Sequence, residues 1–185
     1  MEDARLAADA ASGDERAFEE LITRYRSYVY VIAYKIVLNE EEALDVTQDV
    51  CLKLVEKIQD YGGRGSFRGW LGSIAARTAI DSQRRSRRRE IAVDGRNLDR
   101  YGASVLSTQP EDARQRLERI QRHELVEACM AQLSAQQRAV LTLRLKESMR
   151  PKEIARRLEI PEGQVRTQLA RAIARVRKAL AEEIV

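Results

Sequence analysis

Residues 150–180 read RPKEIARRLEIPEGQVRTQLARAIARVRKAL, and this stretch predicts two helices separated by a turn. Pro151 suits the first position of a helix, and apolar residues at three- and four-residue spacing as far as residue 158 give that helix one buried face. Pro161 then interrupts it, because proline lacks a backbone N–H and disfavours helical backbone in the residue before it. A second helix is predicted over residues 164–180.

The second predicted helix has an apolar face and a polar face, because successive residues turn by about 100° around its axis. The apolar face carries Val165, Leu169, Ala172 and Val176, and the polar face carries Gln164, Thr167, Arg171, Arg175 and Lys178. Such a helix can rest on a small core while its arginines read guanine and its amides read adenine in a major groove. In an isolated helix the polar face would be a solvated basic surface. The preceding helix and turn favour a DNA-binding helix-turn-helix.

The composition favours an all-α protein. The 185 residues include 34% charged and 5% aromatic residues, with nine glycines and three prolines. This length accommodates one ordinary domain or two small ones. Acidic residues dominate residues 40–60, whereas arginine dominates residues 64–89 and 144–178. Such a separation predicts nucleic acid on the basic surfaces and a different partner on the acidic one.

The sequence indicates a cytoplasmic protein without membrane insertion. Its N-terminus lacks the basic and apolar sections of a signal peptide, and its longest apolar run, residues 28–34, is well short of the ~18 residues of a membrane span. Cys51 and Cys129 lie in apolar helical patterns far apart in the sequence, which predicts two core cysteines in a reducing compartment.

No residue pattern indicates catalysis. The single histidine, His123, lies on a predicted helix without Cys, Asp or Glu at a metal-ligand spacing. The glycine-rich residues 62–65 are not followed by the lysine of a phosphate-binding loop, and no Gly-x-Ser-x-Gly elbow is present. We therefore expect no enzyme activity, no metal and no cofactor.

The first half of the chain predicts three helices. Ser12 and Glu15 predict a capping box before the first, and Asn39 caps the second. The apolar repeat of the first helix is Phe18, Leu21, Ile22, Tyr25, Val29, Ile32, Ala33 and Ile36, and that of the second is Leu44, Val50, Cys51, Leu54, Val55 and Ile58. A glycine-rich loop follows over residues 61–66. The third helix begins at Phe67, where the spacing of Trp70 favours a core position over a stacking platform for a base.

The second half follows a polar segment. Residues 90–112 lose helical periodicity and predict a flexible linker. Ser134 and Gln137 then predict a second capping box. The apolar positions around it are Leu117, Ile120, Leu125, Cys129, Met130, Leu133, Val140, Leu141, Leu143 and Leu145. We therefore predict two small helical domains, residues 1–89 and 113–185, joined by a flexible linker.

Several short motifs occur together in one order. The first half contains GDERAFEEL at 13–21, EALDVTQDV at 42–50 and SFRGWLGSIA at 66–75, and the second contains LS at 133–134, VLTLR at 140–144, EIA at 153–155 and IPEGQVRT at 160–167. In this order, across nearly the whole chain, they resemble the extracytoplasmic-function group of bacterial RNA polymerase sigma factors, within the sigma-70 family. The first half resembles region two of that family and the second half resembles region four.

The resemblance implies a sigma factor, which directs promoter-specific transcription initiation, and it assigns roles to three sets of residues. Binding of core RNA polymerase, at the clamp helices of its largest subunit, is implied for Leu44, Asp45, Gln48, Asp49 and Leu52. Contact with the melted minus-ten element is implied for Gly63, Arg64, Ser66, Arg77, Asp81, Arg84, Arg85 and Arg88. Readout of the minus-thirty-five duplex is implied for Gln164, Arg166, Thr167, Gln168, Arg171 and Arg175. An anti-sigma partner that holds such factors inactive is also implied.

The physical chemistry of these residues suits those roles. An acidic amphipathic helix complements a basic partner surface, and a glycine-rich loop beside a basic helix can hold an unstacked base and the phosphates of a single strand. A further set of basic residues could contact the flanking phosphates. Such contacts position the DNA without specifying its sequence. That set is Arg144, Lys146, Arg150 and Lys152.

The chain departs from the family pattern at a few positions. Glu159 stands where the family often has glycine in the turn, so a left-handed backbone there would cost about 1 kcal/mol. Gln168 and Ile173 replace residues that are usually basic, which predicts an unusual promoter preference. Val55 replaces a common aromatic residue, and Thr78 replaces a common amide that would contact the minus-ten element.

Three other functions stay open at this point. A stand-alone helix-turn-helix regulator explains the C-terminal helices but leaves the acidic helix and the glycine-rich loop without a role. A protein-binding adaptor does not explain the stripe of arginine and glutamine. RNA binding would use the arginine cluster, although no RNA-binding module is visible.

Overall fold

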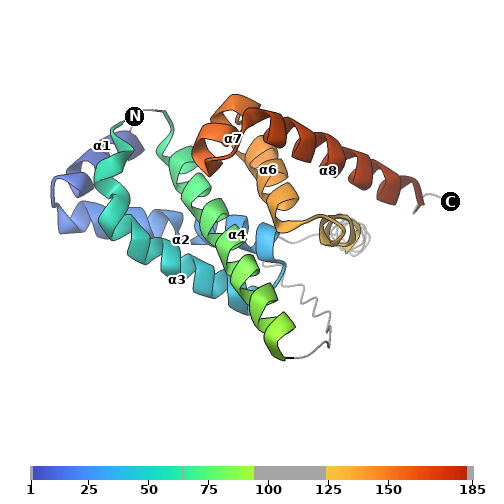
Figure 1. The fold of residues 1–185 in the computed structure, drawn as a ribbon. Helices are drawn as coiled ribbons and strands as arrows, with labels where there is room; N and C mark the ends of the chain where they lie inside the picture. Colours follow the sequence, from blue (N-terminus) through green and yellow to red (C-terminus); the bar gives the residue numbers. More distant parts are fainter. Residues whose placement is uncertain (1, 64, 94–123, 183–185) are drawn as a thin grey trace, which may run out of the picture.

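The computed structural model describes residues 2–63, 65–93 and 124–182, which form helices joined by short turns and contain no strand (Figure 1). The all-α prediction is therefore confirmed. The helices are α1 (Glu2–Ala11), α2 (Glu15–Val37), α3 (Glu40–Lys57), the short 3₁₀ helix η1 (Ile58–Tyr61), α4 (Phe67–Val93), α6 (Ala135–Lys146), α7 (Pro151–Leu158) and α8 (Glu162–Glu182). Residues 124–131 are also helical and precede α6. No helix in the described ranges is both long and apolar enough to cross a membrane.

The starts of α3 and α6 agree with the predicted caps. The Asn39 side chain accepts a hydrogen bond from the backbone of Glu42, and Ser134 and Gln137 form both hydrogen bonds of a capping box. The prediction for α2 was wrong, because Asp14, two residues after Ser12, caps that helix through the backbone N–H groups of the residues two and three positions later. A carboxylate at this position gains additional stability from the positive end of the helix dipole.

Helix α1 is an element that the sequence reasoning missed. It packs along α2 and is fixed by Asp3, which accepts hydrogen bonds from Arg24 and Tyr25 at 2.7 Å each. The hydrogen bond from Tyr25, followed by that from Arg24, lowers the pKa of Asp3. A helix of only ten residues is too short to be stable by itself in water, so its sequence alone did not predict it without these contacts from α2.

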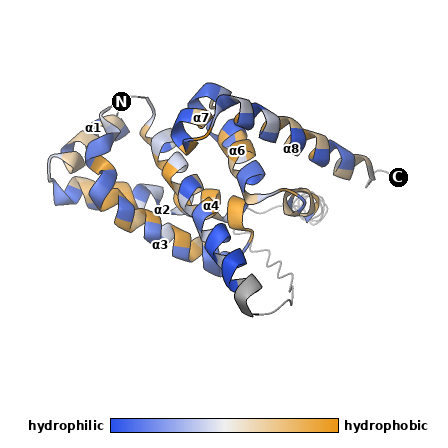
Figure 2. Ribbon diagram, viewed as in Figure 1, coloured by the Kyte–Doolittle hydropathy of each residue, from blue (hydrophilic) through white to orange (hydrophobic). Residues whose placement is uncertain are grey.

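Helices α2, α3 and α4 pack on one another around an apolar core. Most of the predicted α2 repeat is buried, with Phe18 and Ile22 partly buried. Two positions that the apolar repeat of the second helix predicts to be buried, Leu44 and Val55, are instead largely exposed, and Leu145 of α6 is exposed as well. On α3, helical periodicity explains this exposure. Leu44 and Val55 lie on the same side of the helix as Leu52, and this side is opposite the buried Val46 and Val50. The end of α4 is strongly hydrophilic (Figure 2).

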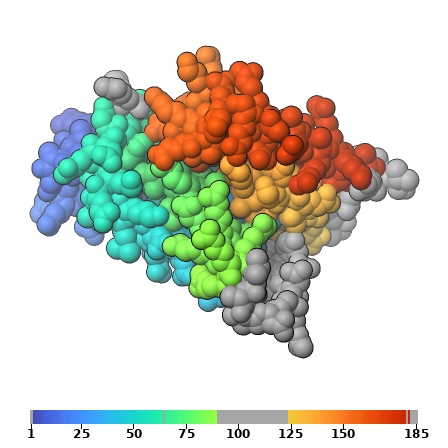
Figure 3. All heavy atoms as spheres, viewed as in Figure 1, coloured from blue at the N-terminus to red at the C-terminus, as the bar shows by residue number. Residues whose placement is uncertain are grey.

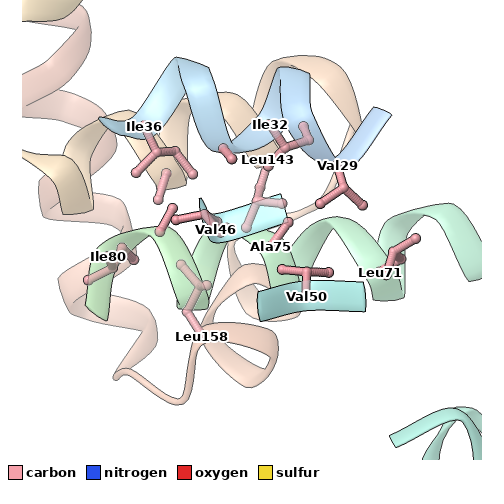
Figure 4. Close-up of a cluster of buried hydrophobic side chains, with 14 of the residues drawn as sticks. Val29, Ile32, Ile36, Val46, Val50, Leu71, Ala75, Ile80, Leu143 and Leu158 are labelled. Atoms are coloured by element: carbon pink, nitrogen blue, oxygen red, sulfur yellow. The ribbon is translucent and has the colours of Figure 1, made fainter. Parts of the chain in front are cut away.

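The core continues from the first half of the chain into the second. Helix α6 packs against α2 and α4, and α7 packs against α4. Leu143 of α6 and Leu158 of α7 belong to the same cluster of buried side chains as Ile32, Ile36 and Ala75 (Figure 4). The space-filling view shows α7 directly against α4 (Figure 3). The two predicted helical units therefore share one hydrophobic core.

Two glycines on α4 allow close packing of neighbouring elements against this helix. A Cβ atom at Gly72 would lie 2.2 Å from the hydroxyl oxygen of Tyr28 on α2, and one at Gly69 would lie 3.1 Å from Cε of Met149, which precedes α7. Any larger residue at Gly72 would therefore displace Tyr28.

The predicted linker and domain boundaries fall mainly outside the described residues. Helix α4 extends to Val93, beyond the predicted boundary at residue 89. Residues 94–112 lie outside the described ranges, as do Leu117, Ile120 and His123.

Candidate nucleic-acid interface

One face of α3 is both apolar and acidic. Leu44, Leu52 and Val55 expose 49%, 69% and 60% of their surface, although large aliphatic side chains usually pack inside a protein. Asp45 and Gln48 are exposed among them. An exposed aliphatic row with polar neighbours is typical of a protein-binding surface. The sequence reasoning placed both Leu44 and Val55 in the buried repeat, although a helical wheel alone would have grouped them with Leu52.

Asp49, at the margin of this face, points toward α4. Its carboxylate lies 3.5 Å from the guanidinium of Arg85. The structure thus joins one predicted polymerase contact to one predicted minus-ten contact. Because both side chains are partly exposed, this ion pair contributes little to stability.

The glycine-rich loop is held by one aromatic side chain. Tyr61 donates a hydrogen bond from its hydroxyl to the backbone oxygen of Gly65 at 2.7 Å. Gly62, Gly63 and Gly65 all have positive φ, a conformation that side chains disfavour. Ser66 accepts a hydrogen bond from the backbone of Gly69 and so joins the loop to the start of α4. Arg64 lies outside the described residues.

The basic residues of α4 differ in their surroundings. Arg84 and Asp81 form a loose pair at 3.9 Å, and Arg88 is exposed. Arg77 points toward α7, where it donates hydrogen bonds to Glu159 Oε1 at 2.8 Å and to the backbone oxygen of Arg157. One arginine of the predicted minus-ten set, Arg77, is therefore hydrogen-bonded to the second half of the chain.

A cavity of about 400 Å³ lies between α3, α4 and α7. Its lining includes Lys53, Trp70, Arg77, Arg157 and Glu159. Burial lowers the pKa of Arg157, and the Nε atoms of Arg77 and Arg157 are buried without a hydrogen-bond partner among the described residues. Unsatisfied cationic donors of this kind favour an oxygen-rich anion such as phosphate.

Trp70 and Thr78 belong to the same region. Trp70 is half-buried, packs against Tyr61 at 5.5 Å between ring centroids and lines the cavity, so it combines a packing position with access to the cavity. Thr78 is buried and accepts a hydrogen bond from Lys53 Nζ at 3.0 Å.

The outward face of α8 is exposed to solvent. The helix extends from α7 away from α1 (Figure 1) and rests on α6 and α7 through the buried Val165, Leu169 and Ala172. The predicted apolar face is thus confirmed. The opposite side exposes Gln164, Arg166, Thr167 and Arg171, with Gln168 half-buried.

Three members of the predicted α8 set make contacts within the protein, and one of them is Thr167, whose hydroxyl donates a hydrogen bond to the backbone oxygen of Gly163 at 2.9 Å. Arg166 forms an ion pair with Glu162 at 2.7 Å on the same exposed surface. Arg175 donates hydrogen bonds to the backbone oxygen of Gln132 at 3.2 Å and to Gln137 Oε1 at 3.0 Å. The structure therefore directs Arg175 toward the start of α6, whereas Arg171 projects outward.

The turn before α8 contains a strained residue. Glu159 ends α7 with φ 55° and ψ 44°, and its N–H bonds to the backbone oxygen of Ala155. The left-handed backbone anticipated at this position is present, at a cost of about 1 kcal/mol for a residue other than glycine. This geometry aims the Glu159 carboxylate at Arg77.

The flanking basic residues lie near the start of α7. Arg144, Lys146, Arg150 and Lys152 are exposed, and Arg144 also donates a hydrogen bond to the backbone oxygen of Met149 at 3.1 Å. Across the described ranges no three His, Cys, Asp or Glu side chains gather as metal ligands. Cys129 is buried and Cys51 half-buried, and burial raises the pKa of the Cys51 thiol.

Two family models match this chain. Residues 21–89 match the family model Sigma-70 region 2, and residues 123–176 match Sigma-70, region 4. The RNA polymerase sigma-H factor of Pseudomonas aeruginosa is 27% identical over 97% of this chain and 94% of its own length. The ECF RNA polymerase sigma factor SigW of Bacillus subtilis is 26% identical over 91% of each chain.

Two solved structures share the fold. CnrH, determined in complex with the cytosolic domain of CnrY, aligns with a TM-score of 0.64 at 24% identity, over 98% of this chain and 99% of its own. The sigma factor RpoE of Bartonella quintana, determined in complex with the anti-sigma factor NepR, aligns with a TM-score of 0.68 at 20% identity, over 89% of this chain and 96% of its own.

Proposed function

Because this chain belongs to the extracytoplasmic-function group of the sigma-70 family, whose members direct RNA polymerase to specific promoters, we propose a role for each of its exposed surfaces. Residues 1–89 act as the unit that binds core polymerase and the minus-ten element, and residues 113–185 act as the unit that reads the minus-thirty-five element. Residues 90–112 connect them. The polymerase carries out the chemistry of transcription, so the chain is not itself an enzyme. It works in the cytoplasm, together with the polymerase.

The α3 face binds core polymerase. The observation that carries this proposal is the exposed aliphatic row of Leu44, Leu52 and Val55 beside Asp45 and Gln48. Burying the row against a partner would remove apolar surface from water, and the carboxylates would select a basic surface. The clamp helices of the largest polymerase subunit are the proposed partner.

The DNA contacts divide between two helices. The loop at residues 61–66 and the basic side of α4 hold the melted minus-ten strand, where the unpartnered Nε atoms of Arg77 and Arg157 beside the cavity suit phosphate oxygens. The outward face of α8 reads the minus-thirty-five duplex, with the exposed Arg171 as a central donor. An anti-sigma protein is a further proposed partner, since CnrH and RpoE were each determined with a protein partner.

In vitro transcription tests the assignment. The full chain is added to core polymerase on a library of promoter fragments, with Asp45→Arg, Arg171→Ala and the control Glu19→Arg, which reverses an exposed charge on α2 outside the α3 face. We expect specific initiation by the native chain and the control, with at least a tenfold loss in Asp45→Arg from charge repulsion at the interface. Tight sequence-specific binding to DNA without core enzyme, and no initiation with it, would instead support a stand-alone regulator.

A further inference from the structure

The cavity of about 400 Å³ beside α7 reaches from the surface into the packed interior. Helices α3, η1, α4 and α7 all contribute to its lining. Tyr61, Ser73 and Thr78 are buried members of this lining, whereas Lys57 and Arg156 are exposed members. A cavity of this volume lies within the range of pockets that enclose a small organic molecule.

Positive charge is in excess around this cavity. Its lining carries five basic side chains against three carboxylates, which leaves two positive charges in excess. The basic side chains are Lys53, Lys57, Arg77, Arg156 and Arg157, and the carboxylates are Asp60, Asp81 and Glu159. A ligand with two negative charges would balance this excess.

The basic side chains differ in how their charge is already satisfied. Arg77 donates hydrogen bonds to Glu159 and to the backbone oxygen of Arg157. By contrast, Lys53, Lys57 and Arg156 form no ion pair within the described part of the chain. Three of the five cations are therefore available to an added anion.

Arg157 is the most enclosed cation of the set. Its side chain exposes 13% of its surface, its nearest carboxylate is Glu153 at 3.9 Å, and its Nε atom has no hydrogen-bond partner among the described residues. Burial is the main cause that lowers the pKa of Arg157, and the positive charge of Arg156 acts in the same direction. Adjacent, partly desolvated cations are costly unless an anion lies beside them.

An aromatic surface adjoins the basic side chains. Trp70 is half-buried and lines the cavity together with Ile74, and its ring packs against Tyr61 at 5.5 Å between centroids. A flat ring of a ligand can stack on such an indole. Inorganic phosphate alone would leave this aromatic surface and most of the volume unused. The lining therefore suits a ligand that joins a flat ring to a phosphate group.

We propose that this cavity binds a free nucleoside monophosphate, with its ring against Trp70 and its phosphate among the basic side chains of α3 and α7. A terminal phosphate monoester carries a charge of about −1.5 to −2 at pH 7, which matches the excess of positive charge. Each phosphodiester of a DNA strand carries only about one negative charge, so a strand matches it less well. The inference goes beyond the proposed function, because it concerns the protein without polymerase or promoter.

Binding to the full chain, without polymerase or promoter, tests the proposal. The probe is adenosine 5′-monophosphate, followed by calorimetry and by the fluorescence of Trp70, which is the single tryptophan and lies at the cavity. We expect saturable binding that changes this fluorescence. Adenosine, which lacks the phosphate, and inorganic phosphate, which lacks the ring, should each bind about tenfold more weakly or less. Cyclic adenosine monophosphate, a diester, should also bind more weakly.

Substitutions of exposed cations locate the bound phosphate. Lys57→Ala and Arg156→Ala should each weaken binding by about tenfold, through loss of a charge-assisted hydrogen bond. Both side chains are exposed, so both variants are expected to fold. The matched control is Lys152→Ala, which removes an exposed charge of α7 that does not line the cavity and should leave binding unchanged.

Two sets of results would overturn the proposal. Equal weakening by Lys152→Ala and Arg156→Ala, or no change in Trp70 fluorescence, would mean that the anion binds only to general surface charge. Binding of a single-stranded oligonucleotide without a terminal phosphate, but not of adenosine monophosphate, would assign the cavity to the DNA strand. Because polymerase and promoter are absent, a failure of the transcription assay would not affect this result.

Discussion

Helices α4 and α8 are both basic helices assigned to DNA, yet their surroundings differ. Arg77 of α4 donates hydrogen bonds to Glu159 and to the backbone oxygen of Arg157 at the end of α7, whereas Arg171 of α8 is exposed on the outward face. The difference arises because α8 packs chiefly on α6 and α7 among the described helices, while α4 packs on α2, α3, α6 and α7. A basic stripe in a sequence therefore indicates charge, and the packing around it determines whether that charge is available.

The largest expected effect concerns the shared core. Leu143→Ala is expected to lower the free energy of unfolding by about 2–5 kcal/mol, because Leu143 is fully buried between α6 and the first half of the chain. The single tryptophan, Trp70, lies on α4 and lines the cavity beside α7, so its fluorescence follows the unfolding of α4 and of its surroundings. If the two halves unfold together, Leu143→Ala shifts the urea unfolding transition to lower urea concentration. The shift is then seen both by Trp70 fluorescence and by circular dichroism.

The control for this experiment is Leu145→Ala on the same helix, which should change stability by less than about 0.5 kcal/mol because its side chain is largely exposed. A Trp70 transition that stays in place in Leu143→Ala while the circular dichroism transition splits would show that the two halves unfold independently.

An intermediate effect distinguishes two arginines of α8. Arg171→Ala should reduce output from a promoter with its minus-thirty-five element by about 5- to 150-fold, which corresponds to about 1–3 kcal/mol for one base contact. Arg175→Ala should lower stability by about 1 kcal/mol through its lost hydrogen bonds to Gln132 and Gln137, with a smaller loss of output.

Transcription and thermal unfolding of both variants make this comparison. An Arg175→Ala variant with unchanged Tm and the same loss of promoter specificity as Arg171→Ala would assign Arg175 to the DNA contact after all.

The smallest expected effect concerns the turn that joins the covered and open surfaces. Glu159→Gly and Glu159→Ala both remove the carboxylate, but only glycine accepts the left-handed backbone without strain. We expect the glycine variant to be more stable than the alanine variant by about 1 kcal/mol. Equal midpoints in urea would mean that residue 159 does not hold this backbone conformation in solution.

Local features of the fold were predictable. The caps at Asn39 and Ser134, the turn at Pro161 and the buried face of α8 depend on residues within four positions of one another, so the sequence displays them directly. The apolar row on α3 was only half recognised, because Leu44 and Val55 also fit a helical repeat whose buried side can be judged only when its neighbours are known.

The sequence by itself determined an all-helical chain, its helix-turn-helix and the residue types that suit polymerase and DNA, since short-range periodicity and side-chain chemistry are local properties. The tertiary structure alone decided that the two halves share a core, that Arg77 meets Glu159 and that Arg175 turns toward α6. Those contacts join residues dozens of positions apart, and each depends on how α6 and α7 pack against α4 and against α8. The periodicity of a helix shows which of its faces is apolar. Which element packs against that face depends on the tertiary structure.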